Sequence, residues 1–290
     1  MQDLFNRRQA SLCIAITLGL ETSAGAAPKT SPIQDFSKLL ERARTSRQLL
    51  EKVRGEREYE EFIRDFNLER APSRSRPSTR TISQKARDLI TTFEVTSAAA
   101  YRRLYQRPIW PKGSSGITIG VGYDTGYVTE DLLRDDWSGY LSDDNLSKLS
   151  AVCNLKGKEA GLALSRVSTV VIPWESANDQ FARKELPRWT GVTEQALPNA
   201  EVLNADCLGA LVSLTFNRGP SFGIPPEKDP TGRFKEMRSI KQLMADKELS
   251  KIPDQIRSMK RIWKDQPDMR GLLLRRDLEA KLFQIGLEHA

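Results

Sequence analysis

The chain has 290 residues, of which 39% are hydrophobic and five are tryptophan. It can therefore bury a sizeable core and is not a disordered protein. A formal net charge of +7 favours a polyanionic partner, for which nucleic acid, an anionic membrane and bacterial cell wall are candidates. The sole histidine is His289 and there is no C-x-x-C pair, which argues against a Ser-His-Asp or Cys-His hydrolase and against a zinc site. No metal and no organic cofactor is expected.

The N-terminal segment has the three-part layout of a secretory signal. Two arginines precede an apolar run from 10 to 20, and small residues lead to Ala26. This order predicts a signal peptide over 1–26, cleaved after Ala26, and a protein exported to the periplasm or the extracellular space. The apolar run is too short to cross a bilayer, so no stable membrane insertion is expected after cleavage. A short buried helix and a retained weak anchor are the alternatives.

Two segments of different composition come next. Residues 27–70 place apolar side chains at helical spacing among many charges, which predicts a helical N-terminal arm. The arm either packs on the main domain or docks on a partner. Residues 71–81 carry Pro, Ser and Arg without a large apolar side chain, which predicts a flexible basic linker before a domain over 82–290.

The domain over 82–290 combines helical and strand patterns. Ser83 is expected to cap a helix that ends near Glu94, whereas residues 98–106 lack a helical alternation of polar and apolar residues. The stretch 113–126, GSSGITIGVGYDTG, predicts a small antiparallel sheet; without G-K-[ST] it is unlike a phosphate loop. Short helices follow, of which 207–219 is the most apolar and is expected at the centre of a helical bundle. The predicted fold class is α+β.

Two carboxylates of this domain lie in contrasting sequence surroundings. Glu94 ends an apolar helix beside Phe93, where burial disfavours a charged carboxyl. Asp124 lies in a glycine-rich turn, where it is expected to stay ionised. Glycoside hydrolysis uses such a pair, one as general acid and the other to activate water. The ordinary alternative is a pair of solvated or salt-bridged carboxylates.

Three separated motifs occur in order along this domain. The first is a helix ending in FE at Glu94, followed by AY and GITIGVGYD; the second is LGALVSLTFNRGPSF and the third is GLLLRRDLEAKLF. In this order they resemble the motifs of the phage-type lysozymes. The resemblance covers most of 82–286 and implies a lysozyme-like fold with a small β-sheet lobe and a helical bundle. Common phage lysozymes carry their second carboxylate shortly after AY, where this chain has Arg102 and Arg103. The order Glu94, Thr118, Asp124 is instead similar to the pesticin-type muramidases.

This resemblance implies a muramidase, which cleaves the β-1,4 bond between N-acetylmuramic acid and N-acetylglucosamine in peptidoglycan. Glu94 would act as general acid, and Asp124 with Thr118 would position the attacking water. Four more residues are expected around the sugar, with one of the arginines pairing with Glu94: Tyr123, Asn217, Arg275 and Arg276. The alternatives are an inactive peptidoglycan-binding module on the same fold and a lytic transglycosylase that uses Glu94 alone.

The partner and the cysteines complete the expectations. Bacterial peptidoglycan is the expected partner, and nucleic acid is not, because the basic residues are scattered and the aromatic residues fall in apolar runs. The protein is expected to be a monomer. Cys153 and Cys207 remain after signal removal, and they either form a disulfide in an oxidising compartment or stay as two buried thiols.

Overall fold

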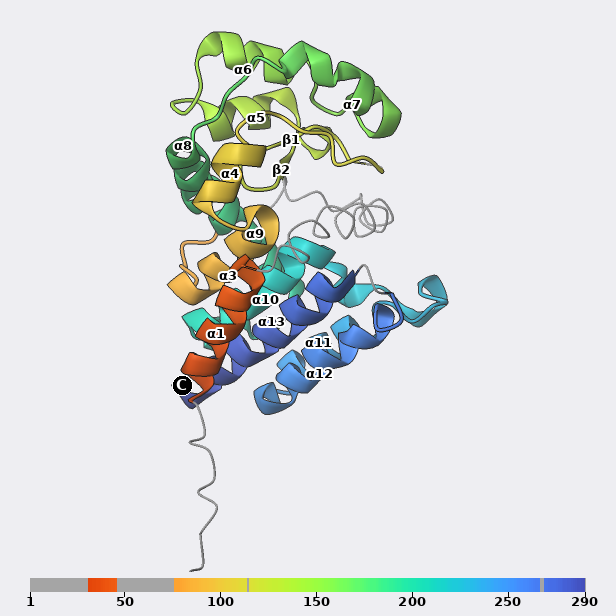
Figure 1. The fold of residues 1–290 in the computed structure, drawn as a ribbon. Coiled ribbons are helices and arrows are strands. Elements are labelled where there is room, and N and C mark those ends of the chain that lie inside the picture. The colour runs from red at the N-terminus through yellow and green to blue at the C-terminus, as the bar shows by residue number, and fades with distance from the viewer. Residues whose placement is uncertain (1–30, 46–75, 114, 267–268, 290) are drawn as a thin grey trace, which may run out of the picture. The chain divides into compact units, whose positions relative to one another are not determined.

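The computed structural model describes residues 31–45, 76–113, 115–266 and 269–289 (Figure 1). All of them belong to one compact unit, Ser31–Ala290. The predicted signal peptide and the greater part of the predicted arm lie outside the described residues. Within these ranges most residues are helical and a single two-stranded antiparallel sheet is present, which confirms the α+β class.

The bounds of the elements define the layout. The strands are β1 (Thr118–Ile119) and β2 (Tyr123–Asp124). The helices are α1 (Pro32–Thr45), α3 (Gln84–Val95), α4 (Ala98–Leu104), α5 (Glu130–Trp137), α6 (Asp143–Ser150), α7 (Gly157–Ala163), α8 (Trp174–Gln180), α9 (Leu186–Ala196), α10 (Ala205–Arg218), α11 (Lys235–Ala245), α12 (Ile252–Ser258) and α13 (Arg270–Glu288). A π-helical turn, Phe181–Glu185, joins α8 to α9.

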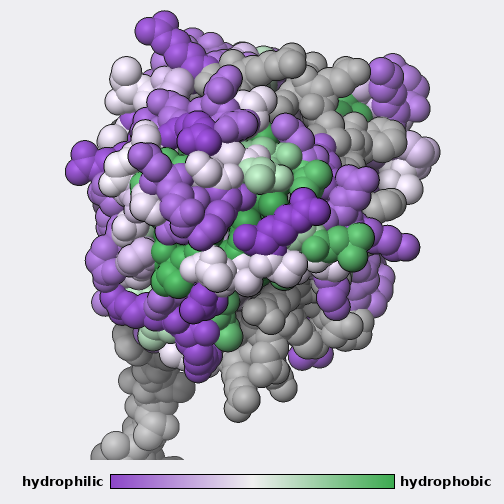
Figure 2. Space-filling model, turned by 90° about the horizontal axis from the view of Figure 1, so that it is seen from above, coloured by the Kyte–Doolittle hydropathy of each residue, from purple (hydrophilic) through white to green (hydrophobic). Residues whose placement is uncertain are grey.

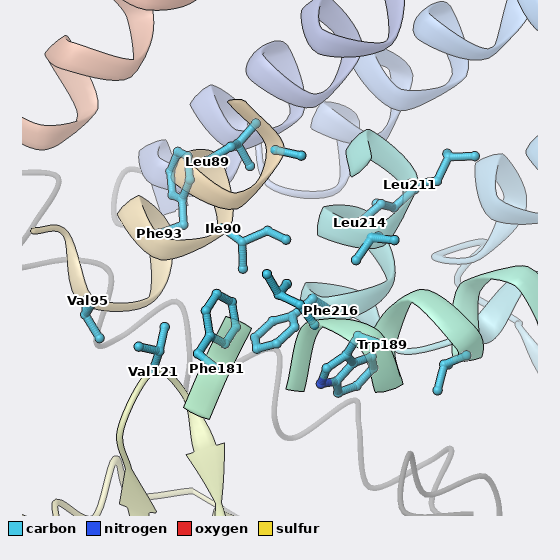
Figure 3. Close-up of a cluster of buried hydrophobic side chains, with 14 of the residues drawn as sticks. Leu89, Ile90, Phe93, Val95, Val121, Phe181, Trp189, Leu211, Leu214 and Phe216 are labelled. Carbon is cyan, nitrogen blue, oxygen red and sulfur yellow. The ribbon is translucent and has the colours of Figure 1, made fainter. Parts of the chain in front are cut away.

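The apolar helix α10 forms the centre of the helical part, as the sequence predicts. Its side chains are buried from Cys207 to Phe216, and the helix packs against α3, α9 and α13. Figure 3 shows Leu211, Leu214 and Phe216 of this helix in one apolar cluster with side chains of α3. A Cβ at Gly209 would overlap Ala86 of α3, so this glycine permits the close approach of the two helices.

The helix α3 begins after a capping serine and ends at a residue with a positive φ. The side chain of Ser83 accepts a hydrogen bond from the Ala86 N–H at 3.2 Å, which confirms the predicted N-cap. Leu89, Ile90 and Phe93 are buried at helical spacing. Thr96, with a φ of 72°, ends the helix, so that Glu94 lies in its last turn.

One expectation about the stretch after α3 is wrong. Residues 98–106 lack a helical pattern, yet Ala98–Leu104 forms the helix α4. Ser97 caps this helix by accepting the Ala100 N–H at 3.1 Å, and Tyr101 is buried with its hydroxyl donating to the Ile172 carbonyl. A local cap and one long-range hydrogen bond outweigh the weak periodicity.

The described part of the predicted arm is a helix docked on the main body. Phe36, Leu40 and Ala43 of α1 are buried, and the helix packs against both α13 and α3. At its two ends Lys281 donates to Asp35 at 2.8 Å and Arg44 Nε donates to Thr92 Oγ1 at 3.1 Å. The helix therefore bridges the two helices that carry Glu94 and the arginine pair.

The second half of the predicted linker lies on α9. The Ser78 N–H donates to the Pro187 carbonyl at 2.8 Å, and Arg80 forms an ion pair with Glu194 at 3.2 Å. A side chain at Gly191 would overlap the Arg76 carbonyl, so glycine allows the chain to pass close to the helix. Residues 76–80 are thus held by specific polar contacts.

The exposed surface is mostly hydrophilic on the face over α6 and α7, with apolar areas between polar side chains (Figure 2). Among the described helices, none combines the length and the apolar character that crossing a membrane requires.

Replacing Leu40 with Ala is expected to lower the free energy of unfolding by about 2–3 kcal/mol, because the substitution leaves a cavity between α1 and its two partner helices. Urea denaturation followed by circular dichroism measures the change. Lys38→Ala, at an exposed position of the same helix, is the matched control and is expected to leave the midpoint unchanged. Equal stability of the Leu40 variant and wild type would contradict the docking of α1.

Candidate active site

The glycine-rich stretch forms a tight hairpin. Thr118 pairs with Asp124 and Ile119 with Tyr123 in the antiparallel register. Gly120 and Gly122 adopt φ values of 55° and 83° in the connecting turn, a region that L side chains rarely occupy. Ile109 extends the sheet by exchanging two backbone hydrogen bonds with Thr118. The predicted antiparallel sheet is confirmed, although its strands are short.

The hairpin brings Thr118 and Asp124 onto one face. The Thr125 N–H donates to the Ile117 carbonyl at 2.9 Å, so Thr118 and Asp124 form the closer, non-hydrogen-bonded type of pair, with their Cα atoms about 4.5 Å apart. Thr118 is 4% exposed and its hydroxyl has no hydrogen-bond partner in the described part of the chain. Because a buried hydroxyl without a partner is costly, this group is suited to bind a water molecule or substrate.

Backbone N–H groups hold the Asp124 carboxylate. Its Oδ1 accepts hydrogen bonds from Gly116 at 3.0 Å and from Gly126 at 2.8 Å, and the residue is 8% exposed. A Cβ at Gly116 would overlap both Gly126 and Asp124 Oδ1, so the two glycines are needed for this close approach. Two N–H donors stabilise the ionised carboxylate and fix its orientation.

Glu94 is paired with an arginine from the closing helix. Its Oε1 lies 3.2 Å from Arg275 Nη1, and Glu94 is only 8% exposed. The Arg275 guanidinium also lies over the ring of Phe93, 5.5 Å from its centroid. Of the two arginines considered from the sequence, Arg275 thus forms an ion pair with Glu94 and fixes the direction of its carboxyl.

A second buried glutamate connects the arginine pair. Glu279 Oε1 lies 3.2 Å from Arg275 Nε and accepts a hydrogen bond from Arg276 Nη2 at 3.0 Å. Arg276 also donates to Asn217 Oδ1 at 2.9 Å. Arg275 and Arg276 orient Glu94 and Asn217 through these hydrogen bonds. Because both arginines are buried, the structure does not support the expected direct contact of either one with sugar. The role of Glu279 was not predicted from the sequence. Its position four residues after Arg275 and three after Arg276 could have indicated it, because residues at these spacings are neighbours on a helix.

The end of α3 and the hairpin turn face one another. Figure 3 shows the side chains of Val95, directly after Glu94, and Val121, in the turn, pointing toward each other. Both are buried. Asp124 lies three residues beyond Val121, at most about 10 Å of extended chain. The structure therefore places the C-terminal end of α3 near the turn of the hairpin that carries Thr118 and Asp124.

Tyr123 does not join this group. Adjacent residues of a strand point to opposite faces, and Tyr123 is 2% exposed with its hydroxyl donating to Asp136 Oδ2 at 2.9 Å. Burial, together with the nearby Asp136 carboxylate, raises the pKa of the Tyr123 phenol far above its usual value. Tyr123 thus lies on the opposite face from Thr118 and Asp124, and the structure gives no support to its predicted contact with substrate.

Cys153 and Cys207, the two cysteines in the described part of the chain, are unpaired. Cys153 Sγ donates to the Leu149 carbonyl and Cys207 Sγ to the Phe283 carbonyl. Burial raises the pKa of Cys153 to about 11 and that of Cys207 to about 12, so both are inert thiols at neutral pH. No cluster of three His, Cys, Asp or Glu residues suited to a metal occurs among the described residues.

No protein-family model matches the chain, and no curated protein matches it. Its function is therefore inferred from the site and from the order of the motifs.

Proposed function

We propose that the protein is a peptidoglycan hydrolase, a muramidase that cleaves the β-1,4 bond between N-acetylmuramic acid and N-acetylglucosamine on a lysozyme-like fold. The observation that carries this proposal is the position of Glu94. Its buried carboxyl is paired with Arg275, and the residue lies in the last turn of α3. The end of this helix faces the turn of the hairpin, on whose strands Thr118 and Asp124 are directly opposite one another.

The proposed reaction divides the work between the two carboxyls. In the reactive form Glu94 is protonated; it gives this proton to the bridging oxygen as the sugar acquires positive charge, and Arg275 pairs with the carboxylate that remains. Asp124, fixed by two glycine N–H groups, accepts a proton from a water molecule that the Thr118 hydroxyl also binds. This water attacks the opposite face of the ring. This direct attack inverts the anomeric carbon and requires the two carboxyls to be roughly 6.5–9.5 Å apart. A separation of about 5 Å would instead make Asp124 the nucleophile of a retaining reaction, in which water releases the sugar from Asp124 in a second step.

Charge and export are consistent with this substrate. A net charge of +7 favours binding to a polyanionic wall, and a signal peptide over 1–26 would deliver the enzyme to the periplasm or beyond it. We propose that the enzyme acts as a monomer.

Turbidity of isolated cell walls tests the proposal. The full chain is expected to clear the suspension and to release fragments with reducing muramic ends, identified by mass spectrometry. Anhydro-muramic ends would identify a lytic transglycosylase instead. Co-sedimentation with walls that are never cleaved would identify a binding module, and either result would contradict the proposed hydrolase.

Replacing Thr118 with Val is expected to lower kcat about tenfold, the worth of one hydrogen bond of about 1.4 kcal/mol to the attacking water. Stability is expected to be unchanged or higher, because the lost hydroxyl has no partner among the described residues. Initial cleavage rates and thermal melts measure both effects.

The matched control for that substitution is Thr193→Val, which removes a buried hydroxyl that donates to the Trp189 carbonyl at 2.8 Å. It is expected to lower stability and leave kcat unchanged. A Thr118 variant with full activity would exclude its hydroxyl from the reaction.

A further inference from the structure

A buried ionic cluster lies against the hairpin on the face opposite to Asp124. Asp136, at the end of α5, is 0% exposed and accepts hydrogen bonds from the Tyr123 hydroxyl at 2.9 Å and from Arg188 Nη1 at 2.9 Å. Arg188 Nη2 donates to the other carboxylate oxygen, so the pair is bidentate. Arg188 also bonds Glu185 at 2.8 Å. Buried charges are tolerated only in such well-matched geometry, which makes this cluster a rigid fixed point.

The hairpin is attached to that fixed point through its second strand. The Tyr123 ring packs edge-on against Trp137, with centroids 5.6 Å apart and planes at 87°. Trp137 also lies directly under the turn, because a Cβ at Gly120 would be 2.7 Å from its ring. The face of the hairpin opposite to Thr118 is thus held by one aromatic contact and one hydrogen bond to Asp136.

The two strands are too short to fix, by their own pairing, the direction in which their side chains point. β1 and β2 have two residues each. Ile109 supports β1 from outside the hairpin, whereas β2 pairs only with β1 in the described sheet, and so short a pairing is marginally stable by itself. Since side chains alternate along a strand, the direction of Tyr123 determines the direction of Asp124. The π-helical turn Phe181–Glu185 lies just before Arg188, and such one-residue insertions recur at functional sites.

We infer that Tyr123, Asp136 and Arg188 are positioning residues that hold the strand β2 and thereby, together with the N–H groups of Gly116 and Gly126, set the orientation of Asp124 toward the attacking water. This inference rests on the proposed function. The three residues do not touch substrate; they act through the strand β2. Loss of the Tyr123 hydroxyl releases the strand on one face and leaves the substrate-binding surface on the other face unchanged, so kcat falls while KM stays the same.

Tyr123→Phe and Tyr101→Phe form a matched pair that tests the inference. Each variant removes one buried phenol hydroxyl, bonded to Asp136 in one case and to the Ile172 carbonyl at 3.1 Å in the other. Both are expected to lose thermal stability. Tyr123→Phe is expected to reduce kcat on isolated walls about tenfold at constant KM, and Tyr101→Phe to keep the wild-type kcat. Equal kcat in the two variants, or a change confined to KM, would overturn the inference.

A double substitution shows whether Tyr123 acts through Asp124. In an Asp124→Asn background the group to be positioned is absent, so Tyr123→Phe is expected to change the residual rate less than twofold. An independent tenfold loss there would show that Tyr123 acts by another route. A wild-type chain that cleaves no wall would overturn the proposed function and this inference together, whereas an active wild type with an unaffected Tyr123→Phe variant would overturn the inference alone.

Discussion

Replacing Glu94 with Gln is expected to lower kcat for wall cleavage by about 10²- to 10⁴-fold, because an amide cannot protonate the bridging oxygen. The exchange keeps the size of the side chain, and its amide oxygen can still accept the hydrogen bond that Arg275 Nη1 donates at 3.2 Å. Arg275 also keeps Glu279 as a counter-charge. The variant is therefore expected to fold as the wild type does, and its lower kcat is expected to reflect only the missing proton donor.

Initial rates of turbidity loss at saturating wall, together with thermal melts, measure this effect. Glu175→Gln is the control, since Glu175 is an exposed glutamate that also pairs with an arginine, Arg102, at 2.6 Å. It is expected to retain the wild-type rate. A folded Glu94 variant that keeps more than about a tenth of the activity would exclude Glu94 as general acid.

Asp124→Asn is expected to reduce kcat by about 10²- to 10³-fold, because the amide can neither take a proton from water nor offset positive charge on the sugar. Its oxygen can still accept the N–H groups of Gly116 and Gly126, so the hairpin is expected to keep its shape. This substitution also separates two mechanisms: a hydrolase needs the second carboxylate, whereas a lytic transglycosylase that uses Glu94 alone does not.

Single-turnover rates and mass spectrometry of the products measure the Asp124 variant. Asp144→Asn, which neutralises an exposed aspartate paired with Lys148, controls for the change in net charge. Unchanged activity of the Asp124 variant, with anhydro-muramic products, would replace the proposed water-activating role by the transglycosylase reaction.

Features set by neighbouring residues could be predicted from the sequence. The Ser83 cap, the glycine-rich hairpin and the apolar helix α10 all follow from short patterns, and the structure confirms them. Residues 98–106 show the limit of this approach, because the helix there depends on the contact of Tyr101 with a residue 71 positions away.

The site was harder to predict because its contacts are long-range. Glu94 and Arg275 are 181 positions apart, and Asp136 and Arg188 are 52 apart. The pairing of Glu94 with Arg275 was expected only from the resemblance of separated motifs. No pattern of neighbouring residues predicted the pairing of Asp136 with Arg188. The direction of Tyr123 could have been predicted from the sequence, because adjacent residues of a strand point to opposite faces and Asp124 is its immediate neighbour.

The helix α1 limits how the domain over 82–290 can be transplanted between proteins. Phe36 and Leu40 cover apolar surface on α3 and α13, so a chimera that received residues 82–290 alone would present that surface to water. Such exposed apolar patches promote aggregation. The transferable module therefore begins before Pro32, and recombination at the linker would separate the domain over 82–290 from part of its own core.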